Sequence, residues 1–495
     1  MSASSYVLGI DIGTSGVKVL VLRDDGRVVA HGQADLPAPV AVGNRREQDA
    51  ELWWSATVAA LQGACQRLRD GGGNPARIAA LAVDGTSGTI VAVDGDLKPL
   101  RAGLMYNDGR AQAQAERLNL AGQATIGGLG YRFNSSFSLA KLLWLNENEP
   151  AVIARSACVL HQADFITARL AEASSVPGRI FSDESNALKS GYDIVARRWP
   201  DYLSTVGIET AKLPAVAAIG ETIGTIGPET AAAFGFNPAC RIVGGMTDGT
   251  AACAASGARR VGDMNTTLGS TVVWKMISAV LICDPAGRLY CHRHPGGDFL
   301  PGGAGNAGGE GIRSFLRVSP QETDQRLEQL AQRIVAQPPS GTFTYPLPGA
   351  GERYPFVDPG FRPFTTVQGD DTALYRSCLE GIACIERWGY EVAAELGADC
   401  DGEVWTTGKG AYLDAWMQMR ANLLNRPVCR AGYPESAFGS ALVAAMNAWF
   451  ENSWEETVGH LIGPTYRWEP APADRAAWDE QYAGFREAFE MIIDY

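Results

Sequence analysis

The sequence predicts an α/β fold with more than one domain, on three observations. The chain has 495 residues, of which 46% are hydrophobic, enough for about two or three domains with separate cores. Short runs with a period of two, typical of strands, alternate with longer segments of helical periodicity. Glycine-rich turns join the two kinds of segment. We therefore expect sheets that are covered by helices.

The N-terminal segment is expected to enter a sheet as an antiparallel hairpin. Residues 6–12 alternate large apolar side chains with other residues, so Asp11 should point away from the bulky apolar face. The pattern continues through strands over 17–22 and 27–33, a helix that starts at Asp49 and stops at Gly71, and a strand over 78–83.

The second half of the chain repeats the strand pattern of the first half. Strands over 264–268 and 271–276 are joined by Gly269-Ser270, and a strand, a glycine turn and a helix follow over 403–424. We expect two domains, covering residues 1–241 and 242–495. Residues 319–370 are rich in Pro, Gly and charge without clear periodicity, so they are interpreted as a surface insertion or linker.

Composition restricts the class of partner. The 42 Lys and Arg against 55 Asp and Glu give a net charge of −13, which repels nucleic acids and anionic membranes and favours a small-molecule partner. The ten cysteines form no C-x-x-C pair and are expected to be reduced thiols. No signal peptide or membrane-spanning run is recognised, so a cytoplasmic protein is expected. A homodimer is possible, since the sequence does not determine the oligomeric state.

The turn after the first strand has the chemistry of a phosphate site. Gly13 lets backbone N–H groups approach phosphate oxygens, and the hydroxyls of Thr14 and Ser15 donate further hydrogen bonds. The carboxylate of Asp11, at the end of the strand, can hold Mg²⁺ through water. An ordinary hairpin with polar turn residues is the competing interpretation.

Further polar groups follow later strands. Asp248 stands between glycines after a short apolar strand, where a carboxylate can accept a proton from a hydroxyl nucleophile; a helix N-cap is the alternative. The segments 84–89 and 106–110 offer the mixture of hydroxyl, amide, carboxylate and guanidinium groups that recognition of a polyol needs. Two unrelated polar loops would explain the same residues.

Two other patterns carry less information. Gly303, Gly305 and Gly308 match G-x-G-x-x-G, which leaves open a dinucleotide site, a glycine turn that approaches ATP, or a surface loop. No P-loop motif occurs. Cys291 and the histidines two apart at 292 and 294 are better explained by a polar edge strand than by a zinc site.

Taken in order, five motifs resemble the FGGY carbohydrate kinases. They are D-x-G-T-S-G at 11–16, D-G-T-S at 84–87, Y-N-D-x-R at 106–110, G-G-x-x-D at 244–248 and T-x-G-K-G near Gly408. The resemblance implies two ribonuclease-H-like domains of the actin, hexokinase and Hsp70 type around a central cleft. It also implies a sugar bound mainly to the first domain and ATP against the second.

The resemblance assigns a role to each matched position. Asp248 would be the general base that takes the proton of the sugar hydroxyl, and Asp11 the acid near Mg²⁺. The sugar would contact Asp84, Ser87, Asn107, Asp108 and Asp248. ATP would contact Gly13, Thr14 and Ser15, the second phosphate loop of Gly269, Ser270 and Thr271, the glycine turn at Gly305, and the adenosine positions Gly408, Gly410 and Trp416.

The sugar is expected to be a ketopentose, phosphorylated at its terminal primary hydroxyl. Xylulokinases have Q-M-H-G and W-x-D-x-R where this chain has residues 83–87 and 106–110, which favours D-ribulose with D-xylulose as the alternative. Asn422 replaces an acid that is usual in the family near the adenosine. A nucleotide-driven sugar sensor and a nicotinamide dehydrogenase remain as alternatives from other classes.

Overall fold

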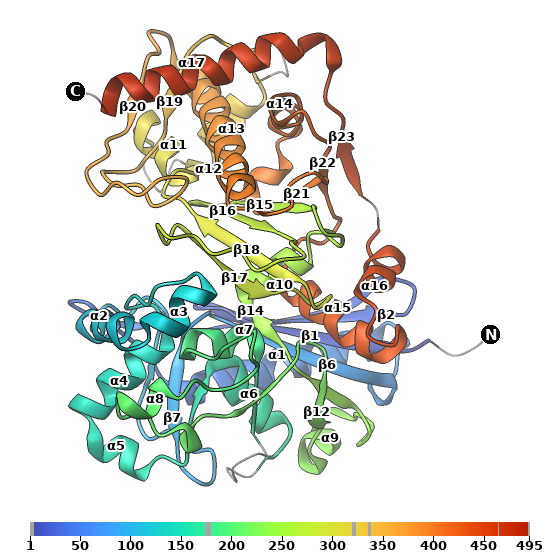
Figure 1. Ribbon diagram of the computed structural model, residues 1–495. Coiled ribbons are helices and arrows are strands. Elements are labelled where there is room, and N and C mark those ends of the chain that lie inside the picture. Colours follow the sequence, from blue (N-terminus) through green and yellow to red (C-terminus); the bar gives the residue numbers. More distant parts are fainter. Residues whose placement is uncertain (1–3, 174–179, 319–322, 335–337, 464, 494–495) are drawn as a thin grey trace. The chain divides into compact units, whose positions relative to one another are not determined.

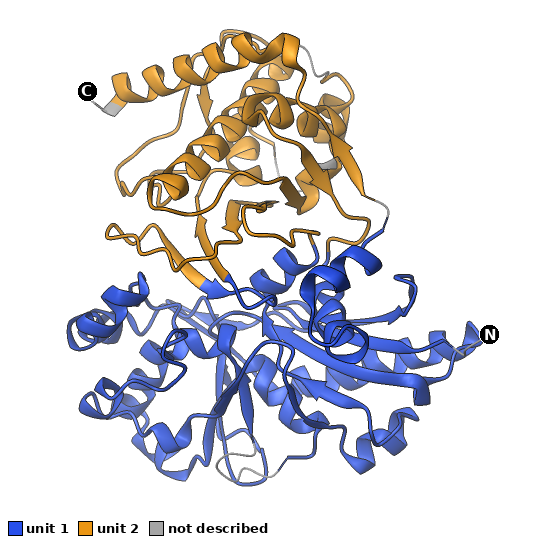
Figure 2. Cartoon of the chain, turned by 45° about the vertical axis from the view of Figure 1, so that its right-hand side comes forward, with its two compact units in different colours: residues 1–255, 292–298, 435–463 blue, residues 256–291, 299–434, 464–495 orange. Residues whose placement is uncertain are grey.

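A computed structural model describes residues 4–173, 180–318, 323–334, 338–463 and 465–493. The chain divides into two compact units (Figure 2). Unit 1 comprises residues 1–255, 292–298 and 435–463, and unit 2 comprises residues 256–291, 299–434 and 464–495. Unit 1 therefore continues past the expected boundary at residue 241 and regains a C-terminal segment. None of the described helices is long and apolar enough to cross a membrane.

A seven-stranded sheet forms the centre of unit 1, in the order β12-β13-β6-β1-β2-β3, with β14 also paired to β6. The strands β1, β2 and β3 are antiparallel, whereas β6 runs parallel to β1 and both β13 and β14 run parallel to β6. The bounds are β1 Tyr6–Ile12, β2 Gly16–Arg23, β3 Val28–Asp35, β6 Ile78–Gly85, β12 Thr222–Thr225, β13 Arg241–Val243 and β14 Met246–Thr247.

Helices cover both faces of this sheet (Figure 1). Helix α1 (Ala50–Asp70) shares one hydrophobic cluster with alternate residues of β1, including Leu8 and Ile10. Helix α15 (Ser436–Trp449) packs with Val7 on the opposite face. Asp11 lies on the α15 face, as the period of two predicts. The pairing of β13 and β14 with β6 explains why unit 1 extends beyond residue 241.

The rest of unit 1 surrounds a five-stranded sheet, β4-β5-β8-β7-β9, and a two-stranded pair, β10-β11. Their bounds are β4 Val40–Val42, β5 Arg45–Gln48, β7 Ile90–Val93, β8 Gly103–Leu104, β9 Cys158–His161, β10 Phe181–Asp183 and β11 Ala215–Ala217. The helices are α2 Gln112–Ala121, α3 Gln123–Leu129, α4 Ser138–Asn148, α5 Pro150–Arg155, α6 Gln162–Leu170, α7 Glu184–Ala187, α8 Tyr202–Thr205, α9 Pro228–Phe234, α10 Asp248–Ala254 and α16 Trp454–Leu461.

Unit 2 repeats the central topology of unit 1. Its sheet has the order β17-β18-β16-β15-β21-β22-β23, in which β15, β16 and β18 are antiparallel while β21 and β22 continue the sheet in parallel. The bounds are β15 Met264–Leu268, β16 Val272–Met276, β17 Leu289–Arg293, β18 Phe299–Ala304, β19 Thr344–Tyr345, β20 Phe364–Thr365, β21 Val404–Thr407, β22 Val428–Arg430 and β23 Tyr466–Trp468. The helices are α11 Gly309–Leu316, α12 Thr323–Ala331, α13 Asp371–Glu395, α14 Asp414–Leu424 and α17 Arg475–Ile493.

The α/β prediction and most of the predicted elements are confirmed. The N-terminal hairpin, the helix capped by Asp49, and the paired strands around Gly269 all form where the sequence places them. Asp49 accepts a hydrogen bond from the backbone N–H of Glu51 at 3.0 Å. The predicted helix over 412–424 begins at Asp414, because a 3₁₀ turn occupies Lys409–Tyr412.

The interpretation of residues 319–370 as a linker is wrong for much of the segment. Its described part contains α12 and the β19-β20 pair, and Tyr345, Tyr354 and Phe361 are buried in the core of unit 2. Residues 319–322 and 335–337 lie outside the described residues. Tyr345 lies on the two-residue strand β19, and Tyr354 and Phe361 lie outside helices and strands, so no helical or strand period marks them.

Candidate functional site

Three aspartates come together where neighbouring parallel strands of unit 1 end. Asp11 on β1 is paired in register with Asp84 on β6, and β14 places Met246 beside Asp84 on the other side. Asp248 follows two residues later as the first residue of α10. The carboxyl ends of parallel strands meet at one edge of a sheet, which is the usual place for a ligand site in α/β proteins.

The carboxyl groups of Asp11 and Asp84 form a hydrogen-bonded pair. Asp84 is fully buried, and burial together with the charge of Asp11 raises its pKa well above the ordinary value. Burial, followed by the charge of Asp248, raises the pKa of Asp11 to about 6, although the hydrogen bond from Asp84 opposes this. Burial and the neighbouring charge thus favour the protonated form of Asp84, whereas the hydrogen bond with Asp84 favours the charged form of Asp11.

Asp84 is held in place by a residue from the far end of the sequence. The Ser440 hydroxyl, on α15, donates to Asp84 Oδ2 at 2.5 Å from a position 356 residues further along the chain. The sequence predicts that Asp84 contacts the sugar. Its burial, the hydrogen bond from Ser440 and its pairing in register with Asp11 instead favour a supporting role beneath Asp11.

Asp248 is half-buried at the start of α10. Its Oδ1 accepts the backbone N–H of Gly249 at 2.7 Å, whereas the N-cap position of the helix is Thr247. The side chain of an N-cap residue usually accepts from an N–H two or three positions later. The competing interpretation of Asp248 as an N-cap therefore does not describe its geometry.

The negative edge of unit 1 suits a hydrated divalent cation. In the described part of the chain, no three His, Cys, Asp or Glu side chains are grouped so that they could enclose a metal ion. Mg²⁺, however, is commonly held by one or two carboxylates, with water and phosphate oxygens supplying the other ligands. The repulsion between Asp11 and Asp248 is the feature that a cation would relieve.

The predicted phosphate turn lies next to Asp11. Gly13 N–H donates to Gly16 O at 2.9 Å, closing the hairpin between β1 and β2, and the carbonyl of Thr14 accepts from Gln48 Nε2 at 3.2 Å. The backbone of this turn is thus fixed from two sides. Thr14 is partly buried and Ser15 is exposed, so the geometry leaves Ser15 accessible to a ligand.

Two of the predicted sugar-binding groups are presented by loops of unit 1. The Ser87 hydroxyl is buried, and among the described residues it has no hydrogen-bond partner. Asn107 and its neighbour Tyr106 are exposed, and the backbone N–H of Tyr106 donates to Thr89 Oγ1 at 2.9 Å. An unsatisfied buried hydroxyl beside exposed polar groups is the pattern of a surface that awaits a polar ligand.

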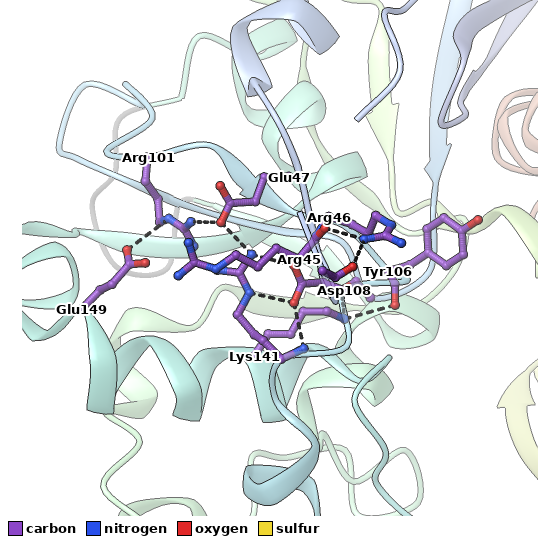
Figure 3. Close-up of polar contacts among 11 residues, drawn as sticks. Arg45, Arg46, Glu47, Arg101, Tyr106, Asp108, Lys141 and Glu149 are labelled. Atoms are coloured by element: carbon purple, nitrogen blue, oxygen red, sulfur yellow. Dashed lines mark hydrogen bonds and ion pairs between the residues drawn. The ribbon is translucent and has the colours of Figure 1, made fainter. Parts of the chain in front are cut away.

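Asp108 is occupied by contacts within the protein (Figure 3). Its two oxygens accept from Arg110 Nε at 2.8 Å, from Arg110 Nη2 at 2.7 Å and from the backbone N–H of Arg46 at 2.7 Å. Burial would raise the pKa of Asp108, but these hydrogen bonds hold it below the ordinary value. Arg110 also pairs with Glu47 and stacks on Trp144. Asp108 therefore fixes its loop.

The glycine segments assigned to the nucleotide meet within unit 2. The turn Gly269–Thr271 follows β15, and the backbone N–H of Gly309 donates to Gly269 O at 3.0 Å. Gly305 N–H donates to Val272 O at 3.0 Å on the same side. Gly408 follows the parallel strand β21 with φ +85°, and a Cβ there would lie 2.4 Å from Leu268 O, so only glycine fits.

Trp416 lies beneath the glycine loops. It is 5% exposed, and its indole N–H donates to Leu379 O at 2.9 Å. A Cβ at Gly410 would lie 2.6 Å from the Trp416 ring, so the ring supports that turn from the core. Asn422, also buried, accepts from Gln418 and from the backbone of Ala471.

Sequence reasoning missed a supporting residue in the segment interpreted as a linker. The carboxylate of Glu352, which is 3% exposed, accepts from the backbone N–H groups of Asn306 at 2.6 Å and Ala307 at 3.4 Å. The hydroxyl of Tyr345 donates to it at 3.0 Å. Glu352 thus fixes the glycine segment that follows β18. Only the spatial pairing reveals this, since no motif surrounds Glu352.

Within the described chain, neither the glycine-rich match nor the histidine pair builds a dinucleotide or zinc site. The G-x-G-x-x-G match begins on β18, which runs antiparallel to β16, whereas a dinucleotide fold needs a parallel βαβ unit. His292 Nδ1 contacts the Ser185 hydroxyl at 3.2 Å, and burial lowers the pKa of His294 to about 3. No cluster of three metal-ligating side chains includes either histidine in the part of the chain that the structure describes.

Replacing Ser440 by alanine should destabilise unit 1 by about 1–3 kcal/mol, because it leaves a buried oxygen of Asp84 without its donor. The free energy of unfolding in urea measures this loss. Ser436→Ala is the matched control on the same helix: its hydroxyl donates to a backbone carbonyl, that of Asp248, and it is less buried. Equal losses for the two variants would contradict the assignment.

Comparisons with known proteins identify two family domains, curated relatives and solved structures that match this chain. The N-terminal domain of the FGGY family of carbohydrate kinases matches residues 6–255, and the C-terminal domain matches residues 297–448. A xylulose kinase of Bacillus subtilis (strain 168) is 27% identical over 463 residues, covering 92% of this chain and 89% of the relative. A gluconokinase of the same strain is 24% identical, covering 94% and 92%.

Solved structures share the fold. A xylulose kinase from Rhodospirillum rubrum aligns with a TM-score of 0.85 at 24% identity, covering 99% of both chains. In both units, antiparallel strands come first and parallel strands extend the sheet. This repeated topology is that of the actin, hexokinase and Hsp70 group, as the motifs predict. The chain therefore belongs to the FGGY family of carbohydrate kinases, phosphotransferases that act on sugar hydroxyls.

Proposed function

We propose that this protein phosphorylates the terminal primary hydroxyl of a ketopentose with ATP, and that the ketopentose is D-xylulose. The observation that carries the proposal is the placement of Asp248, half-buried at the strand edge beside the charged Asp11. Phosphoryl transfer needs a positioned base and neutralisation of phosphate charge rather than covalent catalysis.

Asp248 acts as the general base in this proposal. Its carboxylate accepts the proton of the sugar hydroxyl as that oxygen attacks the γ-phosphate. The N–H of Gly249 bonds one carboxylate oxygen and so fixes the orientation of the side chain.

Asp11 holds Mg²⁺ through water in the same proposal, and the ion when bound neutralises charge on the phosphate oxygens. The hydrogen bond with Asp84 lowers the pKa of Asp11 and so favours its charged form, against the effect of burial. The turn of Gly13, Thr14 and Ser15 binds phosphate oxygens next to it. Unit 2 contributes the glycine loops at Gly269–Thr271, Gly305, Gly408 and Gly410 to the nucleotide, with Trp416 as support from the core.

The sugar is contacted by Ser87 and Asn107, while Asp108 fixes the loop that bears Asn107. The names of the full-length relatives support a ketopentose, because several are xylulose kinases. Two others are gluconokinases, which act on a six-carbon acid. D-Ribulose is the second candidate. Xylulokinases have Q-M-H-G and Trp at the positions of Asp84-Gly85-Thr86-Ser87 and Tyr106. This difference in the sugar loops favours D-ribulose.

The variant Asp248→Asn should lower kcat by about 10²–10⁴-fold, because the amide keeps the shape of the side chain but cannot accept the proton. Binding of ATP, followed by calorimetry, should be retained. Glu229→Gln is the matched control, since Glu229 is an exposed acid in the first turn of another seven-residue helix of unit 1. An unchanged kcat for Asp248→Asn would reject the base assignment.

An ADP-release assay over D-xylulose, D-ribulose, D-gluconate, xylitol and glycerol tests the substrate. We expect kcat/KM to be highest for D-xylulose, because one inverted hydroxyl leaves a buried polar group unpaired. A higher value for D-ribulose would select the second candidate. ATP binding without any sugar phosphate would instead support a sensor.

A further inference from the structure

A lysine of unit 1 lies at the meeting point of three loops. Lys141, on α4, is fully buried, and its Nζ donates to Ser136 O at 2.8 Å, Gly88 O at 3.1 Å and Tyr106 O at 3.4 Å. Figure 3 shows the side chain reaching toward Tyr106 and Asp108. An ammonium group has three donors, so these contacts use all of them.

Each of the three carbonyls belongs to a loop near the proposed sugar groups. Gly88 follows Ser87, whose hydroxyl lacks a partner among the residues described, and Tyr106 precedes the exposed Asn107. The third loop, at Ser136, lies against the first. Gly88 has φ +90°, and a Cβ there would be 2.3 Å from Ser136 O.

Convergence of three carbonyl oxygens is unfavourable unless a donor lies between them. Burying an ammonium is also costly, and burial lowers the pKa of Lys141 to about 7; nearby Asp108 opposes this shift, whereas Lys189 and Arg110 add to it. Asp108 is already taken by Arg110 and the Arg46 N–H. Among the described residues, no carboxylate forms an ion pair with Lys141, so its partners are the loop carbonyls.

We propose that Lys141 is a positioning residue for the sugar, which fixes the loops bearing Ser87, Asn107 and Ser136 in the arrangement that binds the substrate. The inference rests on the proposed function and extends it to the basis of sugar affinity. In the contacts described, Lys141 bonds these loops and not the base Asp248. Its removal should therefore act on sugar binding more than on the chemical step.

Lys141→Met keeps the length of the side chain and removes its donors. We expect the KM for D-xylulose to rise by about 10–100-fold, with a smaller change in kcat and an unchanged KM for ATP. Lys141→Gln retains two N–H donors on a shorter side chain and should give an intermediate KM. Steady-state kinetics and thermal unfolding of the same preparations measure both effects.

Lys212→Met is the matched control. Lys212 also donates Nζ to two backbone carbonyls of unit 1, Ile153 O at 2.6 Å and Ser156 O at 3.0 Å, but on segments that carry no proposed sugar group. We expect it to lower the unfolding temperature while leaving the KM for D-xylulose unchanged. An equal rise in KM for both lysine variants, or loss of kcat alone in Lys141→Met, would overturn the proposal.

Hydrogen exchange on the wild-type enzyme provides a test that does not depend on a folded variant. D-Xylulose should protect residues 86–90, 105–110 and 134–138 together, since one ammonium links them. Protection of none of them, or of one loop alone, would reject the inference. If the wild-type enzyme forms no xylulose phosphate or other sugar phosphate, the proposed function itself fails. An unchanged KM in Lys141→Met, with an active wild-type enzyme, rejects only the role of Lys141.

Discussion

Repulsion between carboxylates at the end of a parallel strand pair is the constraint on which the site in unit 1 depends. Asp11 and Asp84 lie in register on β1 and β6, and the charge on each carboxylate disfavours ionisation of its neighbour. Burial and the charge of Asp11 raise the pKa of Asp84, while the hydrogen bond with Asp84 lowers that of Asp11, so the pair favours a charge on Asp11. One acid thus orients another, and the remaining charge is presented at the edge of the sheet beside Asp248.

This arrangement also explains why the chain returns to unit 1 near its C-terminus. The buried carboxyl of Asp84 needs hydrogen-bond partners, and Ser440 on α15 donates to its Oδ2. The same helix completes the hydrophobic face of β1 through Ala437 and Ala441. Residues 435–463 therefore serve the first unit in both its packing and its electrostatics, although they follow nearly all of the second unit in the sequence.

The two units use one topology for different chemistry. Where unit 1 pairs Asp11 with Asp84, unit 2 pairs Thr267 with Thr407 at the corresponding positions of β15 and β21, and their hydroxyls are 2.7 Å apart. Hydroxyls carry no charge and do not repel an anion, whereas carboxylates attract a cation or accept a proton. We propose catalysis on unit 1 and nucleotide loops on unit 2. This division agrees with the aspartate pair in unit 1 and the threonine pair in unit 2.

The sequence by itself determined the α/β class, the paired hairpins, the cap at Asp49 and the family, because these depend on local periodicity, turn chemistry and short motifs. It also found Asp11, Asp248 and the glycine turns. Only the tertiary structure decided which polar groups are free and which are occupied: Asp108 is bound by Arg110, and Asp84 by Asp11. It likewise revealed Ser440, Glu352 and Lys141, whose partners are distant in sequence or are backbone carbonyls, which leave no pattern in the order of side chains.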